Sequence, residues 1–365
     1  MRVTTLRLVN YRNYGSLALR PDPGLCVLTG ENAAGKTNVL ESVFLCALGR
    51  SHRTVRDGEL VKSGEPGGYV GVTLDTLGGP RQIEMKLSAA ERKKLVVDGK
   101  ALSRSGELLG VLNVVMFAPE DLTIVKGGPG ERRRFIDMVI SQLQPSYYYA
   151  LQKYNAALKQ RNALLKDPGS QYPGALSPWD AQLARLGAAI MLSRAEHVER
   201  VERIASTMHE TLSDGRERLA VAYQPSLAGY DPIHLIDQLE EALSDSVERD
   251  LRYGSTTIGP HRDDILLGLD DTDVRVYGSQ GQQRTVVLSL KLAQLEILRE
   301  ERGEAPVLLL DDVFSELDKR RQQMLVIAVQ GCQTFLTCTH LEELAAAGVQ
   351  RMQVYRAVNG ELIEE

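Results

Sequence analysis

The octapeptide Gly30-Glu31-Asn32-Ala33-Ala34-Gly35-Lys36-Thr37 fits the spacing G-x-x-x-x-G-K-[ST] of a phosphate-binding loop. An apolar run of strand length, Leu25–Thr29, precedes the octapeptide. Apolar residues at helical spacing follow it, and Gly49 ends that pattern. A strand, a glycine-rich loop and a helix in this order are the context in which such a loop binds phosphate. The stretch therefore predicts an α/β domain that binds a nucleotide.

The residue types within the octapeptide suit the chemistry of nucleotide binding. Gly30 and Gly35 allow backbone N–H groups to turn toward phosphate oxygens, and the start of the following helix adds positive potential. Lys36 supplies a positive charge for the β- and γ-phosphates, and Thr37 supplies a hydroxyl ligand for Mg²⁺. We therefore expect ATP and Mg²⁺ as the bound species, with all residues of the octapeptide as nucleotide contacts. The alternative is an ordinary glycine turn before a helix, which the matching flanks disfavour.

The composition is that of a globular protein. The 365 residues are enough for two domains, and 43% hydrophobic with 25% charged residues is ordinary for such chains. No apolar run approaches the length of a membrane span, so no membrane contact is expected, and the start of the chain has no signal-peptide core. Cys26, Cys46, Cys332 and Cys338 are scattered, which disfavours a metal site built on cysteines and favours a cytoplasmic location. The net charge of −5 removes any global basic field but leaves room for a local basic face.

The predicted elements divide the chain into an α/β body and an inserted helical lobe. Residues 1–120 are rich in predicted strands, residues 129–249 are almost entirely helix-forming, and strands return from residue 264. We therefore expect an ATP-binding lobe I, discontinuous in sequence, that consists of residues 1–120 and 303–365. Residues 121–302 are expected to form a mainly helical lobe II.

Local patterns within lobe II give more specific expectations. The run Ser177-Pro178-Trp179-Asp180 predicts a helix start with Ser177 as the N-cap. Another helix is expected from Asp231-Pro232 to near Gly254, and Val274–Val276 is expected to be a strand. A loop rich in Pro, Gly and Ser is expected at residues 167–176.

Paired carboxylates follow a predicted buried strand near the end of the chain. Val307–Leu310 is apolar and is followed by Asp311-Asp312, which matches the second half of a phosphate-loop ATPase site. At the carboxyl end of the strand, Asp311 is placed to hold Mg²⁺ directly or through water. Asp312 is then expected to orient and deprotonate the attacking water. The alternative is a solvated Asp-Asp turn after a buried strand.

A second anion site is expected at Ser279-Gln280-Gly281-Gln282-Gln283-Arg284, just before a predicted helix. This run resembles the signature motif of ABC-type ATPases, usually Ser-Gly-Gly-Gln, with Gln280 as the departure. The resemblance implies that Ser279 serves the nucleotide of a second subunit, in trans. It also implies that His340, after the strand that follows, senses the γ-phosphate. The glutamine that such proteins carry after a lobe I strand has no clear match, and Glu120 is its possible substitute. A capped helix start is the alternative for Ser279, and a structural histidine is the alternative for His340.

Beyond the ATPase motifs, three further stretches are typical of one family: 6–14, 117–122 with 126–127 and 132–137, and 257–264. On these stretches, the whole chain resembles the RecF family of bacterial recombinational-repair ATPases, within the ABC/SMC class. The resemblance implies an ABC-type ATPase head with no long coiled coil, and a weak, slow, DNA-dependent ATPase whose ATP-induced homodimer clamps DNA. Binding would be independent of sequence, on duplex or at a gap junction. RecR and RecO are implied partners, which promote RecA loading and the SOS response.

Other functions stay open at this point. One is an SMC-like or other ABC-class ATPase that does motor work on a protein partner, and another is a structural protein whose nucleotide site no longer works. The basic runs at 50–56, 92–94 and 132–134 are candidates for DNA contact, with a solvated charged face as the alternative for each. Consecutive arginines such as Arg132–Arg134 spread around a helix, so they cannot all face one partner.

Overall fold

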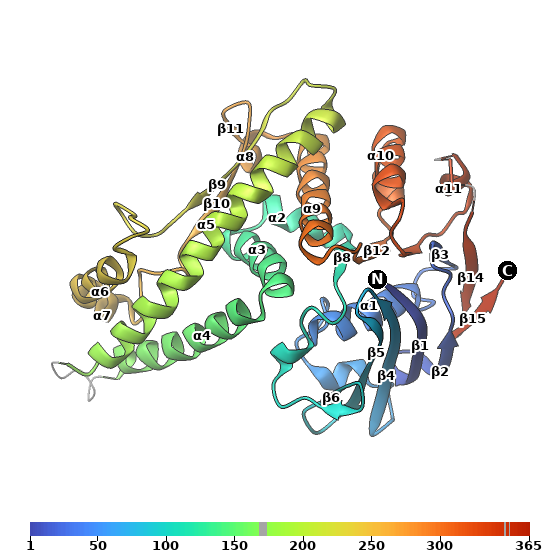
Figure 1. Ribbon diagram of the computed structural model, residues 1–365, viewed down its shortest axis with the longest axis horizontal. Coiled ribbons are helices and arrows are strands. Elements are labelled where there is room, and N and C mark those ends of the chain that lie inside the picture. The colour runs from blue at the N-terminus through green and yellow to red at the C-terminus, as the bar shows by residue number, and fades with distance from the viewer. Residues whose placement is uncertain (168–173, 347, 350) are drawn as a thin grey trace. The chain divides into compact units, whose positions relative to one another are not determined.

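Two compact units make up the chain (Figure 1). The computed structural model describes residues 1–167, 174–346, 348–349 and 351–365. Unit 1 consists of Met1–Asp121 and Leu288–Glu365, and unit 2 consists of Leu122–Val287. The second boundary falls within helix α9 (Gln280–Arg302), whereas the sequence pattern predicts a boundary after residue 302, at the end of that helix. The periodicity of apolar residues predicts a helix, but it does not predict at which residue that helix passes from one unit to the other.

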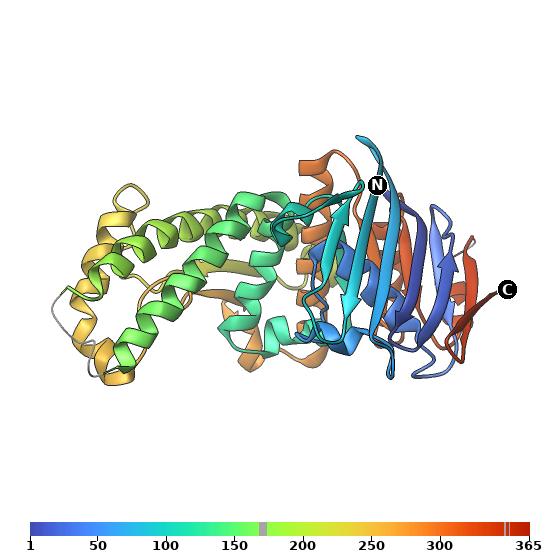
Figure 2. The same cartoon turned by 90° about the horizontal axis from the view of Figure 1, so that it is seen from below.

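Unit 1 contains an antiparallel sheet whose strands are seen side by side in Figure 2. Along β1, Leu6 and Leu8 are buried while Arg7 and Val9 are exposed, which is the alternation of a sheet with one covered face. In spatial order its strands are β2 (Tyr14–Leu19), β1 (Arg2–Tyr11), β4 (Gly67–Thr76), β5 (Gly79–Ser88), β6 (Lys94–Val97) and β7 (Lys100–Ala101).

A second, mostly parallel sheet positions the loops of the candidate site. Its neighbouring strands from β14 to β8 run parallel, and only β15 is antiparallel. The loops that follow the parallel strands therefore meet at one edge, where ligands bind in open α/β sheets. In spatial order the strands are β15 (Glu361–Glu364), β14 (Gln353–Val358), β3 (Leu25–Thr29), β13 (Thr334–Thr337), β12 (Val307–Asp311) and β8 (Val114–Phe117).

Helix α1 (Lys36–Leu48) contacts both sheets of unit 1. Val39 and Val43 are fully buried, and so is Glu41, because sheets cover the helix on more than one side. The remaining helices of unit 1 are η1 (Asp57–Leu60), η2 (Ser105–Leu108), η5 (Phe314–Glu316), α10 (Lys319–Val329) and α11 (Glu342–Ala346), and η3 (Pro119–Leu122) lies at its boundary.

Unit 2 is mainly helical and includes a small antiparallel sheet. Its longest helix, α5 (Ser177–Ser213), packs against α4 (Pro145–Lys166) and α6 (Leu235–Asp245). The sheet order is β11 (Thr272–Asp273), β10 (Asp264–Leu269) and β9 (Leu219–Gln224). The other helices are α2 (Thr123–Lys126), α3 (Pro129–Leu143), α7 (Val247–Tyr253) and α8 (Val274–Tyr277). None of the described helices in either unit is long and apolar enough to cross a membrane.

Several local expectations for this unit were wrong. The N-cap of α5 is Leu176 rather than Ser177, and Asp180 binds Arg161 instead of completing a cap. The segment expected as a strand at 274–276 lies in the short helix α8. The prediction failed because three residues are too few to distinguish helical periodicity from strand periodicity. The helix expected up to Gly254 is two helices that meet at Ser246. Strand β9 was missed, and residues 168–173 of the expected loop lie outside the described part of the chain.

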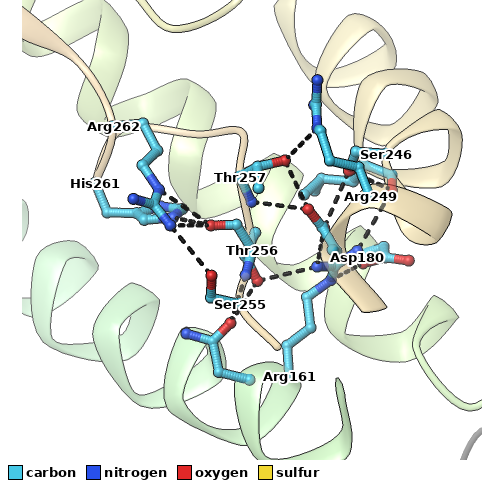
Figure 3. Close-up of polar contacts among 12 residues, drawn as sticks. Arg161, Asp180, Ser246, Arg249, Ser255, Thr256, Thr257, His261 and Arg262 are labelled. Carbon is cyan, nitrogen blue, oxygen red and sulfur yellow. Dashed lines mark hydrogen bonds and ion pairs between the residues drawn. The ribbon is translucent and has the colours of Figure 1, made fainter. Parts of the chain in front are cut away.

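A buried charge network anchors the loop between α7 and β10 (Figure 3). Arg161 is fully buried, and its guanidinium donates to Asp180 at 2.6 Å, to Asp250 at 2.5 Å and to the Thr256 hydroxyl at 2.9 Å. Asp250 is fully buried as well and accepts from the backbone N–H and the hydroxyl of Thr257, at 2.9 and 2.6 Å. Because every buried charge has a partner, removing one member would leave another uncompensated, at a cost of about 3–5 kcal/mol.

The same loop is held from other sides by an arginine and a histidine. Arg194 binds Asp137 at 2.9 and 3.0 Å and donates to the Pro260 carbonyl at 2.6 Å. His261 lies between the Tyr154 hydroxyl, 2.7 Å from its Nδ1, and the Thr256 carbonyl, 3.0 Å from its Nε2. Burial lowers the pKa of His261 to about 4, so the ring is neutral at pH 7 and its Nε2–H donates to the carbonyl.

Gly259 is the position in this loop that a side chain would disturb most. Its φ is +123°, and a Cβ there would lie 2.4 Å from the Tyr154 hydroxyl oxygen, which is buried and cannot swing away. We expect Gly259→Ala to destabilise the protein by more than about 2 kcal/mol. Gly229→Ala is the matched control, since Gly229 also has a positive φ, +66°, but open space around it. Thermal unfolding followed by circular dichroism compares the two variants, and equal shifts would contradict the steric argument.

Candidate nucleotide site

The loop between β3 and α1 is shaped to receive an anion. Gly30, Ala33 and Gly35 have φ values of 129°, 66° and 109°. Backbone that turns through the left-handed region in this way directs successive N–H groups into a concave nest that suits phosphate oxygens. Within the described part of the chain, no side chain caps the start of α1, so its first N–H groups remain available to a ligand. The loop therefore fits a phosphate group.

The turn between β1 and β2 holds this loop in place. The Asn13 side chain donates to the Ala34 carbonyl at 2.9 Å and accepts from the Asn38 side chain at 2.8 Å. The Tyr14 hydroxyl donates to the Gly35 carbonyl at 3.1 Å. A Cβ at Gly35 would lie 2.4 Å from the Asn13 amide nitrogen, so glycine permits this close approach. Asn13 and Tyr14 were not predicted as site residues, although both lie in a stretch that resembles the RecF family.

Lys36 lies over its own loop. Its ammonium donates to the Gly30 carbonyl at 2.5 Å and to the Glu31 carbonyl at 3.2 Å, and the residue is only 5% exposed. Carbonyl oxygens are weaker partners for an ammonium than ionised phosphate oxygens. The side chain is therefore positioned to exchange these carbonyls for phosphate.

Thr37 and Asp311 lie together at the edge of the parallel sheet. The hydroxyls of Thr37 and Thr337 each donate to the same Asp311 carboxylate oxygen, Oδ1, at 2.8 Å. Because the Thr37 hydrogen is donated to Asp311, its oxygen keeps lone pairs for a cation. Burial raises the pKa of Asp311, the charges of Asp312 and Glu120 raise it further, and the two hydroxyl hydrogen bonds oppose them. A divalent cation would relieve this excess of negative charge.

The protein groups around Thr37 do not complete a metal site by themselves. Over the part of the chain that is described, no group of three or more His, Cys, Asp or Glu side chains could hold a metal ion. Mg²⁺ is usually bound by one or two protein ligands together with the phosphates of the substrate and water. The donor set of Thr37 and Asp311 fits that kind of site.

Asp312 is held in an uncommon conformation. Its φ is +49°, its N–H donates to the Thr337 hydroxyl at 2.9 Å, and its carbonyl accepts from the Ser315 hydroxyl at 2.9 Å. A left-handed backbone is uncommon outside glycine and often marks a functional residue. The two hydrogen bonds therefore hold the backbone of Asp312, and with it the position of its Cβ atom, in place.

A cavity of about 1020 Å³ lies beside the phosphate-binding loop within unit 1. Its wall includes residues Gly30 to Ala34, the turn after β13 and the turn between β14 and β15. His340 belongs to the turn after β13 and is exposed, so the structure brings it to the same cavity as the loop. Glu120 lies in η3, which follows β8, the neighbour of β12 in the sheet.

Ser279 lies in unit 2 and caps helix α9. Its N–H donates to the Gln282 side chain at 2.7 Å, and the Gln282 N–H donates to the Ser279 hydroxyl oxygen at 3.2 Å. This reciprocal pair is a capping box, so the structural alternative weighed for Ser279 is present. Neither bond uses the Ser279 hydroxyl hydrogen, and the residue is exposed. Capping and contact with an external anion are therefore compatible.

Each basic run that is a candidate for DNA contact includes a cation that binds another side chain of the same protein. Arg132 binds Asp264 at 2.7 and 2.9 Å, and Lys93 binds Asp57 at 2.5 Å. Arg53 donates to the Asn38 side chain at 3.0 Å. These contacts use the cations to position loops and helices, which weakens the case for them as a DNA surface.

A buried carboxylate on α1 was not predicted. Glu41 is fully buried and accepts from Arg12 at 2.6 and 2.8 Å and from the Ser51 hydroxyl at 2.5 Å. Burial alone would raise the pKa of Glu41, but the hydrogen bonds from Arg12 and Ser51 outweigh it and lower that pKa. The ionised carboxylate therefore ties the β1–β2 turn and the stretch after α1 to the helix of the phosphate-binding loop.

The fold and the site together define the class of this protein. Residues 2–362 match the family model described as the RecF/RecN/SMC N-terminal domain. The Smc head domain of Pyrococcus furiosus, solved with an extended coiled coil and bound to part of ScpA, shares the fold, with a TM-score of 0.59 at 14% identity over 100% of this chain and 96% of that chain. The expected ABC/SMC-class ATPase head is thus confirmed.

Within this class, the chain belongs to the RecF family of DNA replication and repair proteins. It is 41% identical over 362 residues to the RecF of Lachnoclostridium phytofermentans, covering 99% of each chain. It is 42% identical over 366 residues to the RecF of Alkaliphilus oremlandii, covering 99% of this chain and 100% of that protein. A structure of the recombination mediator protein RecF with ATP, from the RecFOR pathway, has a TM-score of 0.92 and 35% identity over 100% of this chain and 97% of that chain. The predicted family is confirmed.

Proposed function

We propose that this chain is an ATP-dependent DNA-binding protein of recombinational repair and replication-fork maintenance, and that its ATP-bound homodimer clamps DNA. The observation that supports this most is the bond between Thr37 and Asp311 beside an uncapped, anion-shaped loop. A hydroxyl that is hydrogen-bonded to a carboxylate next to a phosphate-binding loop suits Mg·ATP better than a simple phosphate ion. Membership of the RecF family supports the DNA-directed part of the proposal.

The loop residues Gly30 to Thr37 are proposed to hold the triphosphate. Their backbone N–H groups would surround its oxygens, and Lys36 would place its charge against the β- and γ-phosphates. Thr37 and Asp311 are proposed to hold Mg²⁺, which when bound would neutralise negative charge on the phosphates. Asn13 and Tyr14 are proposed as positioning residues, because each holds a carbonyl of the loop.

Hydrolysis is proposed to be slow and to release the clamp. Asp312 would orient a water molecule and accept its proton, which the fixed position of its backbone supports. His340 would report whether the γ-phosphate is present, which its place on the wall of the cavity supports. A weak ATPase stimulated by DNA would then act as a timer for DNA release.

Ser279 is proposed to act on the nucleotide of a second copy of the chain. Its exposed position at the start of α9 supports such a role, and so does its hydroxyl hydrogen, which neither bond of the capping pair with Gln282 uses. A triphosphate gripped by both copies would add its binding free energy to dimer formation. Nucleotide state would thereby decide whether the clamp is closed.

The partners are proposed from the relatives. Proteins of this family are named for DNA replication and repair, and one solved relative is assigned to the RecFOR pathway. We propose that this chain works with RecR and RecO near gaps in cytoplasmic DNA, and so promotes RecA loading and SOS induction. Contact with DNA would be to its backbone and independent of sequence.

Substitution of Ser279 tests the role in trans. We expect Ser279→Arg to bind ATP normally but to weaken dimer formation by about 100-fold or more, since like charge or a clash in an interface costs several kcal/mol. Ser279→Asp should do the same while preserving the helix cap, because aspartate is also a good N-cap. Light scattering with and without Mg·ATP measures the dimer, and Ser244→Arg on the exposed side of α6 is the control. A normal ATP-induced increase in mass for both Ser279 variants would refute the role in trans.

A further inference from the structure

Four exposed cations lie in or beside the loop that leaves α7. Two of them, Arg249 and Arg262, are labelled in Figure 3 next to the buried network. Arg249 and Arg252 lie on α7, and Arg262 lies in the loop itself. Lys166, at the end of α4, lies against the loop, since a Cβ at Gly254 would be 3.3 Å from its Cγ. Unit 2 therefore gathers cations from separate segments of the chain in one place.

Arg249 is oriented by the buried network. Its Nε donates to the Thr257 hydroxyl at 2.9 Å, and that hydroxyl donates to Asp250 at 2.6 Å. Asp250 is in turn fixed by Arg161. This chain of bonds uses one nitrogen of the Arg249 guanidinium and leaves both of its Nη groups for another acceptor.

Arg262 is oriented by neutral oxygen atoms. Its Nε and Nη2 donate to the Thr256 carbonyl at 3.1 and 2.9 Å, and Nη2 also lies 3.4 Å from the Ser255 hydroxyl. The remaining nitrogen, Nη1, is not used by these contacts. A guanidinium held in one orientation loses little entropy when it binds an anion, which favours affinity.

The described acids near these cations do not form ion pairs with them, although Asp167 and Glu248, the sequence neighbours of Lys166 and Arg249, are exposed. Asp180 and Asp250 are bound to Arg161, and both acids are turned toward the interior. Within the described ranges, none of Lys166, Arg249, Arg252 and Arg262 has a carboxylate within ion-pair distance. The basic runs at 50–56, 92–94 and 132–134 differ in this respect. Four of their cations have an acid within 4.0 Å, namely Arg53, Arg56, Lys93 and Arg132.

We propose that Lys166, Arg249, Arg252 and Arg262 form a binding site for the phosphate backbone of DNA on unit 2. The proposal rests on the proposed function and names a surface for its DNA contact. Guanidinium groups, an ammonium and the Ser255 hydroxyl, which lies 3.4 Å from Arg262, are donors that bind phosphates rather than base edges. Two or more stacked aromatic side chains would be expected for single-strand recognition, and Tyr253 alone does not provide them. The site therefore suits duplex backbone in any sequence.

The double variant Lys166→Gln/Arg252→Gln tests the site with little risk to the fold, because neither side chain makes a hydrogen bond or ion pair that the described structure records. Fluorescence anisotropy with a labelled duplex, in Mg·ATP and at several salt concentrations, gives both affinity and salt dependence. We expect affinity near 0.1 M salt to fall about tenfold or more, and the slope of log K against log[salt] to become shallower by about 2. Light scattering on the same samples should show an unchanged response to ATP.

The matched control is Arg185→Gln/Arg203→Gln, which removes the same charge from exposed positions of α5 in the same unit. It should keep the affinity and the salt slope of the unaltered chain. If the unaltered chain binds DNA and the Lys166/Arg252 variant binds equally well with the same slope, the site is wrong while the proposed function stands. An equal loss in the control would also overturn the site, since the effect would then be one of overall charge. An unaltered chain that binds no DNA would overturn the proposed function itself and the site with it.

Discussion

Lys36→Ala is expected to abolish ATP binding and, with it, the ATP-dependent dimer. The Lys36 ammonium is the charge that lies over the phosphate-binding loop, where its partners among the described residues are the backbone carbonyls of Gly30 and Glu31. Removing it would leave the triphosphate without this cation in a partly buried site. We expect a loss of affinity of about 100-fold or more, or about 3 kcal/mol.

The measurement for this variant has two parts. Titration with a fluorescent ATP analogue gives affinity, and light scattering gives the mass with and without Mg·ATP. Lys86→Ala, at an exposed position of strand β5, removes the same side chain from the same unit and should leave both results unchanged. Retention of ATP affinity by Lys36→Ala would contradict the assignment of the loop as the nucleotide site.

Asp312→Asn is expected to trap a long-lived ATP-bound dimer. The amide can still orient water, but it cannot accept the proton, and loss of a general base typically slows a reaction about 10²–10⁴-fold. Asparagine tolerates a left-handed backbone, so the conformation at φ +49° should survive. The variant should therefore bind ATP and DNA normally while turnover falls.

Phosphate release under single-turnover conditions, together with the lifetime of the ATP-bound dimer, measures this effect. Asp271→Asn is the matched control, because Asp271 also has a positive φ, +66°, and is exposed in unit 2. Unchanged turnover in Asp312→Asn would move the general base to another residue. Turnover lost together with ATP binding would instead assign Asp312 a role in holding the nucleotide.

The parts of the site that lie on one continuous element were predictable from the sequence. The loop from Gly30 to Thr37 has a fixed spacing between a strand and a helix, and the structure has β3 and α1 on either side. Asp311 ends β12, the buried strand that was expected from the apolar run Val307–Leu310, and this strand lies in a parallel part of the sheet. Local periodicity was sufficient in these places because chemistry and secondary structure share the same few residues.

The supporting contacts were not predictable because they join distant positions. Asn13 reaches Ala34 and Arg12 reaches Glu41 only after β1, β2 and α1 have packed together. A buried glutamate such as Glu41 leaves no periodic signal that distinguishes it from an exposed one. In unit 2, the stretch from Thr257 to Asp264 signalled a family, but its physical role became visible only through the buried Arg161 and Arg194.

The central claim is that ATP joins two copies of this chain, and the most direct test is the molar mass in solution. Sedimentation equilibrium with Mg·ATP, with Mg·ADP and without nucleotide should give twice the monomer mass only with Mg·ATP, at a protein concentration where the other two samples are monomeric. A monomer at saturating Mg·ATP, with nucleotide demonstrably bound, would contradict the account.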